Sequence, residues 1–97
     1  MINVGLYYKV KKGHKKEFEE MFNKVLEMLK GSNAGFLTGK LYREVGTSNE
    51  YLIYTEWKDF ESFKEFISSR SFSDAQEYGK SILEGMPRHR IFREETV

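Results

Sequence analysis

The spacing of apolar residues changes along this chain, and that change limits the folds it can adopt. Residues 2–10 place Ile2, Val4, Leu6 and Tyr8 at every second position, which is the pattern of a β-strand. From residue 17 to residue 31 the apolar side chains instead recur every three or four positions, with Lys and Glu between them. That spacing is typical of an amphipathic helix. The sequence therefore predicts a strand followed by a helix at the start of the chain.

Turn-forming residues divide the middle of the chain into two further strands. A loop is expected over 32–35, because Ser, Asn, Ala and Gly follow the end of the first helix. A strand is expected over 35–45 and another over 50–57, with the turn at 46–49 between them. The two strands are expected to pair as a hairpin.

The last part of the chain predicts helical structure and a final strand. Asp59 is well placed to cap a helix whose apolar stripe runs through 60–67. After a break, a short helix is expected over 73–84, and Pro87 prevents it from resuming. Residues 88–95 are expected to form the last strand.

The order of these elements is strand, helix, strand, strand, helix, strand. This order is typical of the α+β, ferredoxin-like fold (βαββαβ), in which a four-stranded antiparallel sheet carries its helices on one face. The chain has 97 residues, a length that suits a single domain over residues 1–97.

The face of the sheet that the helices leave uncovered is expected to be buried as well. The strand at 35–45 places Leu37 and Leu41 on one side and Phe36 and Tyr42 on the other. Apolar groups on both sides of a strand indicate that both faces of the sheet are covered. A second copy of the chain is the simplest cover, so we expect a homodimer that packs through the open face of the sheet.

Composition and charge exclude several classes of protein. The net charge is +1 with acidic and basic residues interleaved, so a nucleic-acid partner is not expected. Cysteine is absent, which excludes disulfides and thiolate chemistry, and the two histidines lack the spacing of a metal site. No apolar run approaches the roughly 18 residues of a membrane span, and no room is left for a signal peptide. We therefore expect no metal, no membrane partner and a cytoplasmic location.

Four stretches of the chain are informative when taken together: the opening strand into Lys12-Gly13, NAGFLTGKLYRE, YLIYTEWKDFESFKEFISSRSF and the closing RHRIFREE. They resemble the antibiotic biosynthesis monooxygenase (ABM) domain family of the dimeric α+β barrel superfamily. The spacing of Trp57, Phe63 and Phe72 is the most specific part. The resemblance implies a ferredoxin-like subunit that pairs into a dimeric barrel. It also implies a monooxygenase that acts without metal or flavin on a hydrophobic, phenol- or quinone-like aromatic substrate.

Other members of that family degrade heme, and the resemblance allows their site to be compared. They are expected to use an Asn on the first strand and a Trp and a His in the second helical region. The matching positions of this chain hold Leu6, Phe66 and Gln76. Leu cannot form the hydrogen bond of the amide, and Gln is not an axial ligand of the histidine kind. Heme degradation in its usual form is therefore not expected.

The aromatic residues of the second half of the chain have two interpretations. Buried aromatic side chains at helical spacing most often form a core. Alternatively, they line an apolar substrate pocket between the sheet and the second helix. The pocket hypothesis takes in six residues: Leu6, Trp57, Phe63, Phe66, Phe72 and Gln76.

Four polar side chains are candidates for catalysis. Tyr7, Tyr8 and Tyr54 can each donate a hydrogen bond to a phenolate or carbonyl oxygen of a substrate, although Tyr is also an ordinary strand residue. His89 titrates near neutral pH, so it can serve as an acid or a base. The alternative function is a non-catalytic homodimeric module that binds a small hydrophobic ligand. Polar groups that converge on the cleft between the sheet and the second helix would favour the enzyme over this non-catalytic module.

Overall fold

The computed structural model describes residues 1–32, 35–46 and 49–96 of the chain. Part of the expected loop (Asn33 and Ala34) and part of the expected turn (Thr47 and Ser48) lie outside the described residues. The elements are β1 (Ile2–Lys9), α1 (Lys15–Ser32), β2 (Phe36–Arg43), β3 (Glu50–Trp57), α2 (Phe60–Ile67), α3 (Arg70–Gly79) and β4 (Arg88–Phe92). Among the described residues, no helix is long and apolar enough to cross a membrane.

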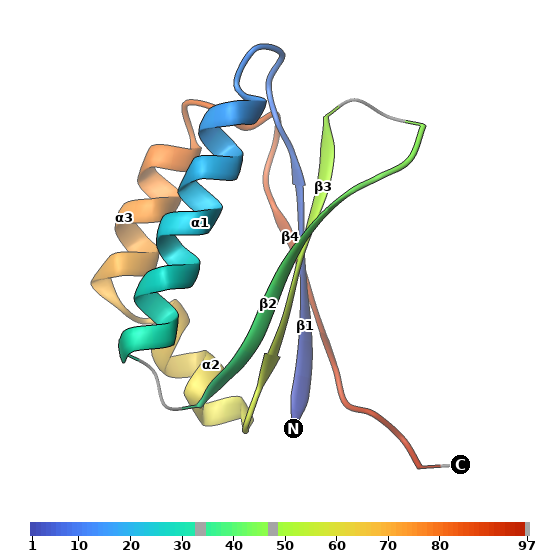
Figure 1. The fold of residues 1–97 in the computed structure, drawn as a ribbon, viewed down its shortest axis with the longest axis vertical. Coiled ribbons are helices and arrows are strands. Elements are labelled where there is room, and N and C mark those ends of the chain that lie inside the picture. Colours follow the sequence, from blue (N-terminus) through green and yellow to red (C-terminus); the bar gives the residue numbers. More distant parts are fainter. Residues whose placement is uncertain (33–34, 47–48, 97) are drawn as a thin grey trace.

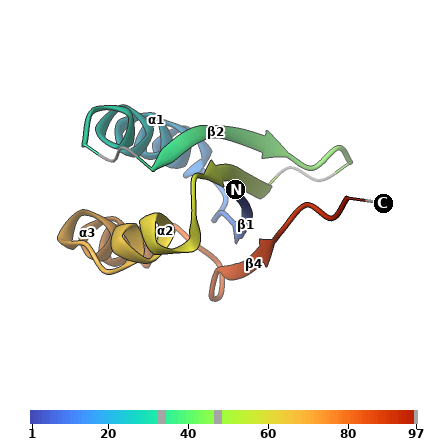
Figure 2. The ribbon, with the colours of Figure 1, turned by 90° about the horizontal axis from the view of Figure 1, so that it is seen from below.

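The four strands form one antiparallel sheet in the order β2-β3-β1-β4. All three helices lie on the same side of this sheet, and its other side carries none of them (Figure 1). Figure 2 shows α1 toward the β2 edge and α2 and α3 toward the β4 edge. The predicted ferredoxin-like fold is confirmed, and within one chain the sheet is open.

The last helix begins earlier than the sequence predicted. Asp59 caps α2 as expected, because its carboxylate accepts a hydrogen bond of 2.8 Å from the backbone N–H of Ser62. The expected start of α3 at residue 73 is wrong, because Ser69 caps it and accepts a hydrogen bond from the N–H of Phe72 at 3.2 Å. Phe72 therefore lies in the first turn of α3 and not in a break between helices.

The same helix also ends earlier than predicted, at Gly79 instead of residue 84. Beyond it, the carbonyl of Ile82 accepts a hydrogen bond of 2.8 Å from the N–H of Lys11, and Leu83 forms a β-bridge with Val10. These backbone hydrogen bonds to the end of β1 draw the segment out of the helix. The final strand is shorter than predicted, since β4 ends at Phe92.

A β-bulge in β2 overturns the predicted alternation of its side chains. The register shifts between Phe36, which pairs with Trp57, and Thr38, which pairs with Glu56. A bulge adds one residue to one strand, so the side chains before it change face. Phe36 therefore packs against Trp57 on the helix side, whereas Leu37 is 52% exposed. The expectation that Leu37 shares the face of the half-buried Leu41 is wrong.

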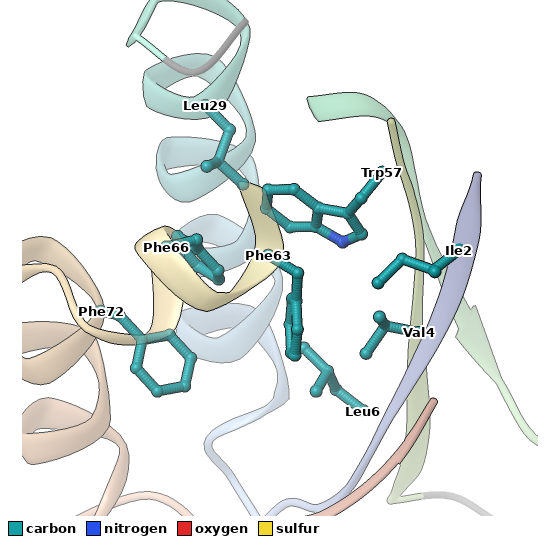
Figure 3. Packing of buried hydrophobic residues seen from close by; sticks show 8 residues of the cluster. All are labelled: Ile2, Val4, Leu6, Leu29, Trp57, Phe63, Phe66 and Phe72. Atoms are coloured by element: carbon teal, nitrogen blue, oxygen red, sulfur yellow. The ribbon is translucent and has the colours of Figure 1, made fainter. Parts of the chain in front are cut away.

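The core lies between the helices and the sheet, and Trp57 is at its centre (Figure 3). The Trp57 ring is fully buried and stacks on Phe66 with ring centroids 5.4 Å apart. Its Nε1–H donates a hydrogen bond of 2.8 Å to Oγ1 of Thr55. The only polar atom of this side chain is thus already paired inside the protein. The buried cluster around it is Ile2, Val4, Leu6, Leu29, Trp57, Phe63, Phe66 and Phe72.

The side of the sheet that the helices leave open has a mixed character. The phenol of Tyr54 donates a hydrogen bond of 2.7 Å to Glu56 and accepts one of 2.5 Å from the amide of Asn3. Around this polar centre, the aromatic rings of Tyr42 and Phe92 are about half exposed. The open face therefore combines a polar network with exposed aromatic surface.

Candidate functional site

A cavity lies on the helix side of the sheet, between α1 and α3. Its volume is about 330 Å³, at the lower end of the roughly 300–1,000 Å³ of ligand pockets in general. Its walls come from β1, β2, β3, α1, α2, α3 and the segment 85–87, which leads into β4. The lining is largely apolar, with residues that include Leu6, Met21, Val25, Leu29, Ile53, Phe66, Phe72 and Ala75.

Small residues in the walls leave space for this cavity. Gly39 of β2 and Ala75 and Gly79 of α3 all line it. A Cβ atom on Gly39 would lie 3.1 Å from Cδ1 of Leu26 and 3.2 Å from the ring of Phe36. Both contacts are tighter than ordinary van der Waals separations, so a larger residue here would require these two side chains, which also line the cavity, to move. The absence of a side chain at Gly39 thus leaves space where β2 meets α1.

Tyr8 is the polar group in the interior of the cavity. It extends from β1 toward the helices, and its ring packs against Phe18 with centroids 5.3 Å apart. Its hydroxyl forms no hydrogen bond with any residue that the structure describes, yet none of those residues has a fully enclosed, unpaired side-chain oxygen or nitrogen. The phenol oxygen is therefore not fully enclosed, and Tyr8 is one of the residues that line the cavity. Burial raises the pKa of Tyr8 to about 12, so the phenol remains a neutral hydrogen-bond donor at physiological pH.

This shifted pKa predicts a loss of stability in alkaline solution. Above pH 10 the Tyr8 phenol ionises in the unfolded chain but stays protonated in the folded chain until about pH 12. Its contribution to the free energy of unfolding is complete below pH 10 and should fall by about 2 kcal/mol by pH 12. Urea unfolding across this range should show a flatter pH dependence for Tyr8→Phe than for wild type. If the free energy of unfolding changed equally with pH in both proteins, the buried position of the Tyr8 phenol would be contradicted.

The polar end of the cavity belongs to α3. Gln76 of α3 and Lys80, the residue that follows the end of this helix, line the cavity and are exposed to solvent. The ammonium group of Lys80 donates a hydrogen bond of 3.1 Å to Glu77. Thr55 also lines the cavity, but its hydroxyl is already engaged by Trp57 and by the carbonyl of Val4.

The structure separates the six residues of the pocket hypothesis into two groups. Leu6, Phe66, Phe72 and Gln76 line the cavity. Trp57 and Phe63 are outside the lining; both are buried in the adjoining core, where their rings contact each other with centroids 5.5 Å apart. The indole N–H of Trp57 therefore does not reach a ligand in this cavity. Residues of α1 and of 85–87, which the hypothesis did not include, complete the walls.

The four catalytic candidates lie on two sides of the sheet. The strand register places Tyr7 opposite Leu52 and Tyr54 opposite Gly5, which puts both Tyr side chains on the open face. Only Tyr8 of the three lines the cavity. His89 of β4 lies opposite Leu6, on the helix side, and its ring is 6.5 Å from that of Phe72. The alternation of strand side chains already separates Tyr7 from Tyr8.

Comparison with known proteins identifies the family. The model of the antibiotic biosynthesis monooxygenase family matches residues 1–78. The chain belongs to this family. Two solved structures share its fold: a conserved protein from Methanosarcina mazei (TM-score 0.85, 23% identity, 97% of this chain and 92% of that one) and SnoaB, a cofactor-independent oxygenase from Streptomyces nogalater (TM-score 0.82, 20% identity, 99% and 94%).

Two curated relatives are named for heme binding and not for a monooxygenase activity. A Natronomonas pharaonis protein named "putative heme-binding protein" is 31% identical over 86 residues, which are 89% of this ABM chain but 14% of the relative. A similarly named protein of Halobacterium salinarum is 30% identical, and 17% of it is covered. The chain thus spans about a seventh of the length of the first relative and about a sixth of the second.

The lining of the cavity does not fit heme in the way proteins usually hold it. No histidine or cysteine is among the residues that line it. Met21 and Met86 do line it, but methionine ligates heme iron together with a histidine. The raised pKa of Tyr8 disfavours the tyrosinate form that would bind iron. Leu6, Phe66 and Gln76 supply no other iron ligand.

Proposed function

We propose that this ABM protein is a small monooxygenase that acts, without metal or flavin, on a hydrophobic aromatic substrate of the phenol or quinone type. The observation that supports this proposal is the apolar cavity with one neutral, unpaired phenol, Tyr8, in its interior. Apolar walls exclude water and accept an aromatic ring, and a fixed donor is worth most where water is excluded.

The proposed reaction needs only the substrate and molecular oxygen. A suitable substrate is an anthrone, in which a CH₂ group is activated by the aromatic ketone. Loss of one proton from this CH₂ gives an enolate, which donates electrons to O₂, and the carbon forms a bond to one oxygen atom. The O–O bond then breaks as the second proton leaves the carbon, so CH₂ and O₂ become C=O and H₂O. Tyr8 would donate a hydrogen bond to the enolate oxygen, where the negative charge develops.

Filling the cavity should block binding without harming the fold. Ala75 lines the cavity, so Ala75→Leu should lower the affinity for anthrone about tenfold or more, because the added carbons occupy the space of the ligand. Ser73 is exposed on the same helix, so Ser73→Leu is the matched control and should bind as wild type does. Fluorescence titration without oxygen measures the affinity. Equal affinities for the two variants would contradict binding in this cavity.

A titration with hemin tests whether this chain binds heme, the property for which the curated relatives are named. Because no histidine or cysteine lines the cavity, we expect no saturable binding at one hemin per chain when the Soret band is followed. Tight stoichiometric binding, followed by loss of the band when reductant is added in air, would contradict this proposal in favour of heme degradation.

The alternative function is a non-catalytic module that binds a small hydrophobic ligand. The scarcity of polar groups in the cavity favours it, because Tyr8 is the one unpaired polar side chain found in its interior among the described residues. Saturable binding of anthrone with no acceleration of its oxidation would support this alternative.

We further propose a homodimer that packs through the open face of the sheet. The half-exposed rings of Tyr42 and Phe92 on that face support this proposal. Light scattering at micromolar concentration should give twice the chain mass for wild type and for Phe60→Glu, which changes a ring of similar exposure on α2. Phe92→Glu should shift the population toward monomer. A wild-type monomer would contradict the proposal.

A further inference from the structure

We propose that the ligand of the cavity carries a carboxylate, and that Lys80 binds this group at the solvent end while the rings of the ligand fill the apolar interior. This inference rests on the proposed function, which places a ligand in this cavity, and it narrows the substrate class from hydrophobic aromatic compounds in general to hydrophobic aromatic acids. The arrangement that carries it is one exposed cation in the lining of an otherwise uncharged cavity.

Lys80 is the source of charge in the cavity lining. Within the part of the chain that the structure describes, no Asp, Glu or Arg and no second Lys lines this cavity. The other polar side chains in the lining, Tyr8, Thr55 and Gln76, are neutral. A lining with one cation and no carboxylate attracts a negatively charged ligand and disfavours a positively charged one.

Tyr8 and Lys80 lie toward the same end of the cavity. Val10, two residues beyond Tyr8 on the same strand, forms a β-bridge with Leu83, which is three residues beyond Lys80. Figure 1 shows that α3 ends at the level where α1 begins. Leu29, in the last turn of α1, lines the opposite end, which is apolar. A bound aromatic acid would therefore lie with its rings toward Leu29 and its oxygen atoms toward Tyr8 and Lys80.

The ion pair that Lys80 makes within the chain is one that a ligand can replace. Its ammonium group donates a hydrogen bond of 3.1 Å to Glu77, and both side chains are 75% exposed. So exposed an ion pair contributes little to stability, and exchanging the carboxylate of Glu77 for that of a ligand costs little. The gain for the ligand is also modest, because water and salt screen the charge. Lys80 therefore selects among ligands that the apolar walls already accept.

The position of Lys80 at the end of α3 also has a purely structural explanation. Its backbone N–H donates hydrogen bonds to the carbonyls of Gln76 and Tyr78, so it is the C-terminal cap of the helix. A cation near a helix C-terminus interacts favourably with the helix dipole. That effect does not depend on the charge of a ligand. A comparison of an acid with a neutral ligand of the same shape therefore separates the two roles.

Anthracene-2-carboxylate and its methyl ester make this comparison, because they share the ring system and differ in charge. Neither has an activated CH₂ group, so fluorescence titration measures their binding without oxidation. The quantity compared between proteins is the ratio of acid affinity to ester affinity, which cancels the different desolvation of the two compounds. Lys80→Gln should lower this ratio about fivefold, and Lys80→Glu should lower it about tenfold or more.

Two further variants show whether the change is specific. Glu77→Gln removes the carboxylate that competes for Lys80, so it should raise the ratio about twofold. Lys64 is an exposed lysine in the last turn of α2, outside the lining, and Lys64→Gln should leave the ratio unchanged. Added salt should lower the wild-type ratio, because it screens an exposed charge.

The outcomes distinguish this inference from the proposed function. A wild-type ratio in both Lys80→Gln and Lys80→Glu, even with equal losses of affinity for acid and ester, would overturn the assignment of Lys80 and leave the proposed function intact. The expected fall in the ratio, together with no protein-dependent oxidation of anthrone, would support the acid-binding cavity and contradict the monooxygenase. Absence of binding of both compounds to the wild-type protein would contradict both.

Discussion

Replacing Trp57 by alanine should lower the free energy of unfolding by about 3–5 kcal/mol, the range for large aromatic-to-alanine changes in a core. The ring is fully buried and contacts Phe36, Phe63 and Phe66 with centroids 5.3–5.5 Å away. The truncation would leave a large void and remove the partner of Thr55. Urea unfolding followed by circular dichroism measures the loss.

Phe60 is the matched control for this prediction, because it is an aromatic residue of α2 that is 43% exposed. Phe60→Ala should change the free energy of unfolding far less, since most of what it removes already contacts water. Because Trp57 does not line the cavity, the activity of Trp57→Ala should fall in step with the fraction of folded protein. A Trp57→Ala protein as stable as Phe60→Ala would contradict the core position of the indole.

Removing the hydroxyl of Tyr8 should have the largest effect on activity. If Tyr8 stabilises the enolate, Tyr8→Phe should lower the rate of anthrone oxidation about 10²–10³-fold, as loss of one donor to a developing oxyanion does elsewhere. Affinity for the unreacted ligand should fall much less, because a neutral hydrogen bond contributes only about 0.5–1.5 kcal/mol. Rates at saturating anthrone, combined with oxygen-free titrations, separate the two effects.

Tyr7→Phe is the control for this second prediction. Tyr7 adjoins Tyr8 in the chain but lies on the open face of the sheet, so loss of its hydroxyl should leave turnover unchanged. Tyr8→Phe with turnover within twofold of wild type would rule out Tyr8 as the donor. Equal losses in both variants would point to a general effect on β1 instead of a local one in the cavity.

The order of elements could be predicted because each element carries its own local signal. The alternation in β1 and the helical spacing in α1 follow from which side chains face the core. The boundaries of α3 could not be predicted in the same way. They depend on the Ser69 cap and on the hydrogen bond between Lys11 and Ile82, which joins residues far apart in the chain.

The candidate site could be predicted only in part, for a physical reason. Periodicity identifies the inner face of α2 and α3, but core and cavity lie on that same face. Trp57 and Phe66 are both buried, yet only Phe66 lines the cavity. The difference depends on where α1 and α3 pass over the sheet and on the small residues Gly39 and Ala75 between them. A bulge such as the one after Phe36 likewise leaves no clear mark in the sequence.

The most direct test of the central claim is aerobic oxidation of anthrone by chelator-treated protein under ¹⁸O₂, followed by mass spectrometry of the product. The account predicts one ¹⁸O atom in each quinone and one O₂ consumed per quinone. It also predicts a rate well above the reaction without protein, and a rate close to that background for Tyr8→Phe and Ala75→Leu. Oxidation by wild-type protein no faster than the background, or faster only after flavin or hemin is added, would contradict it.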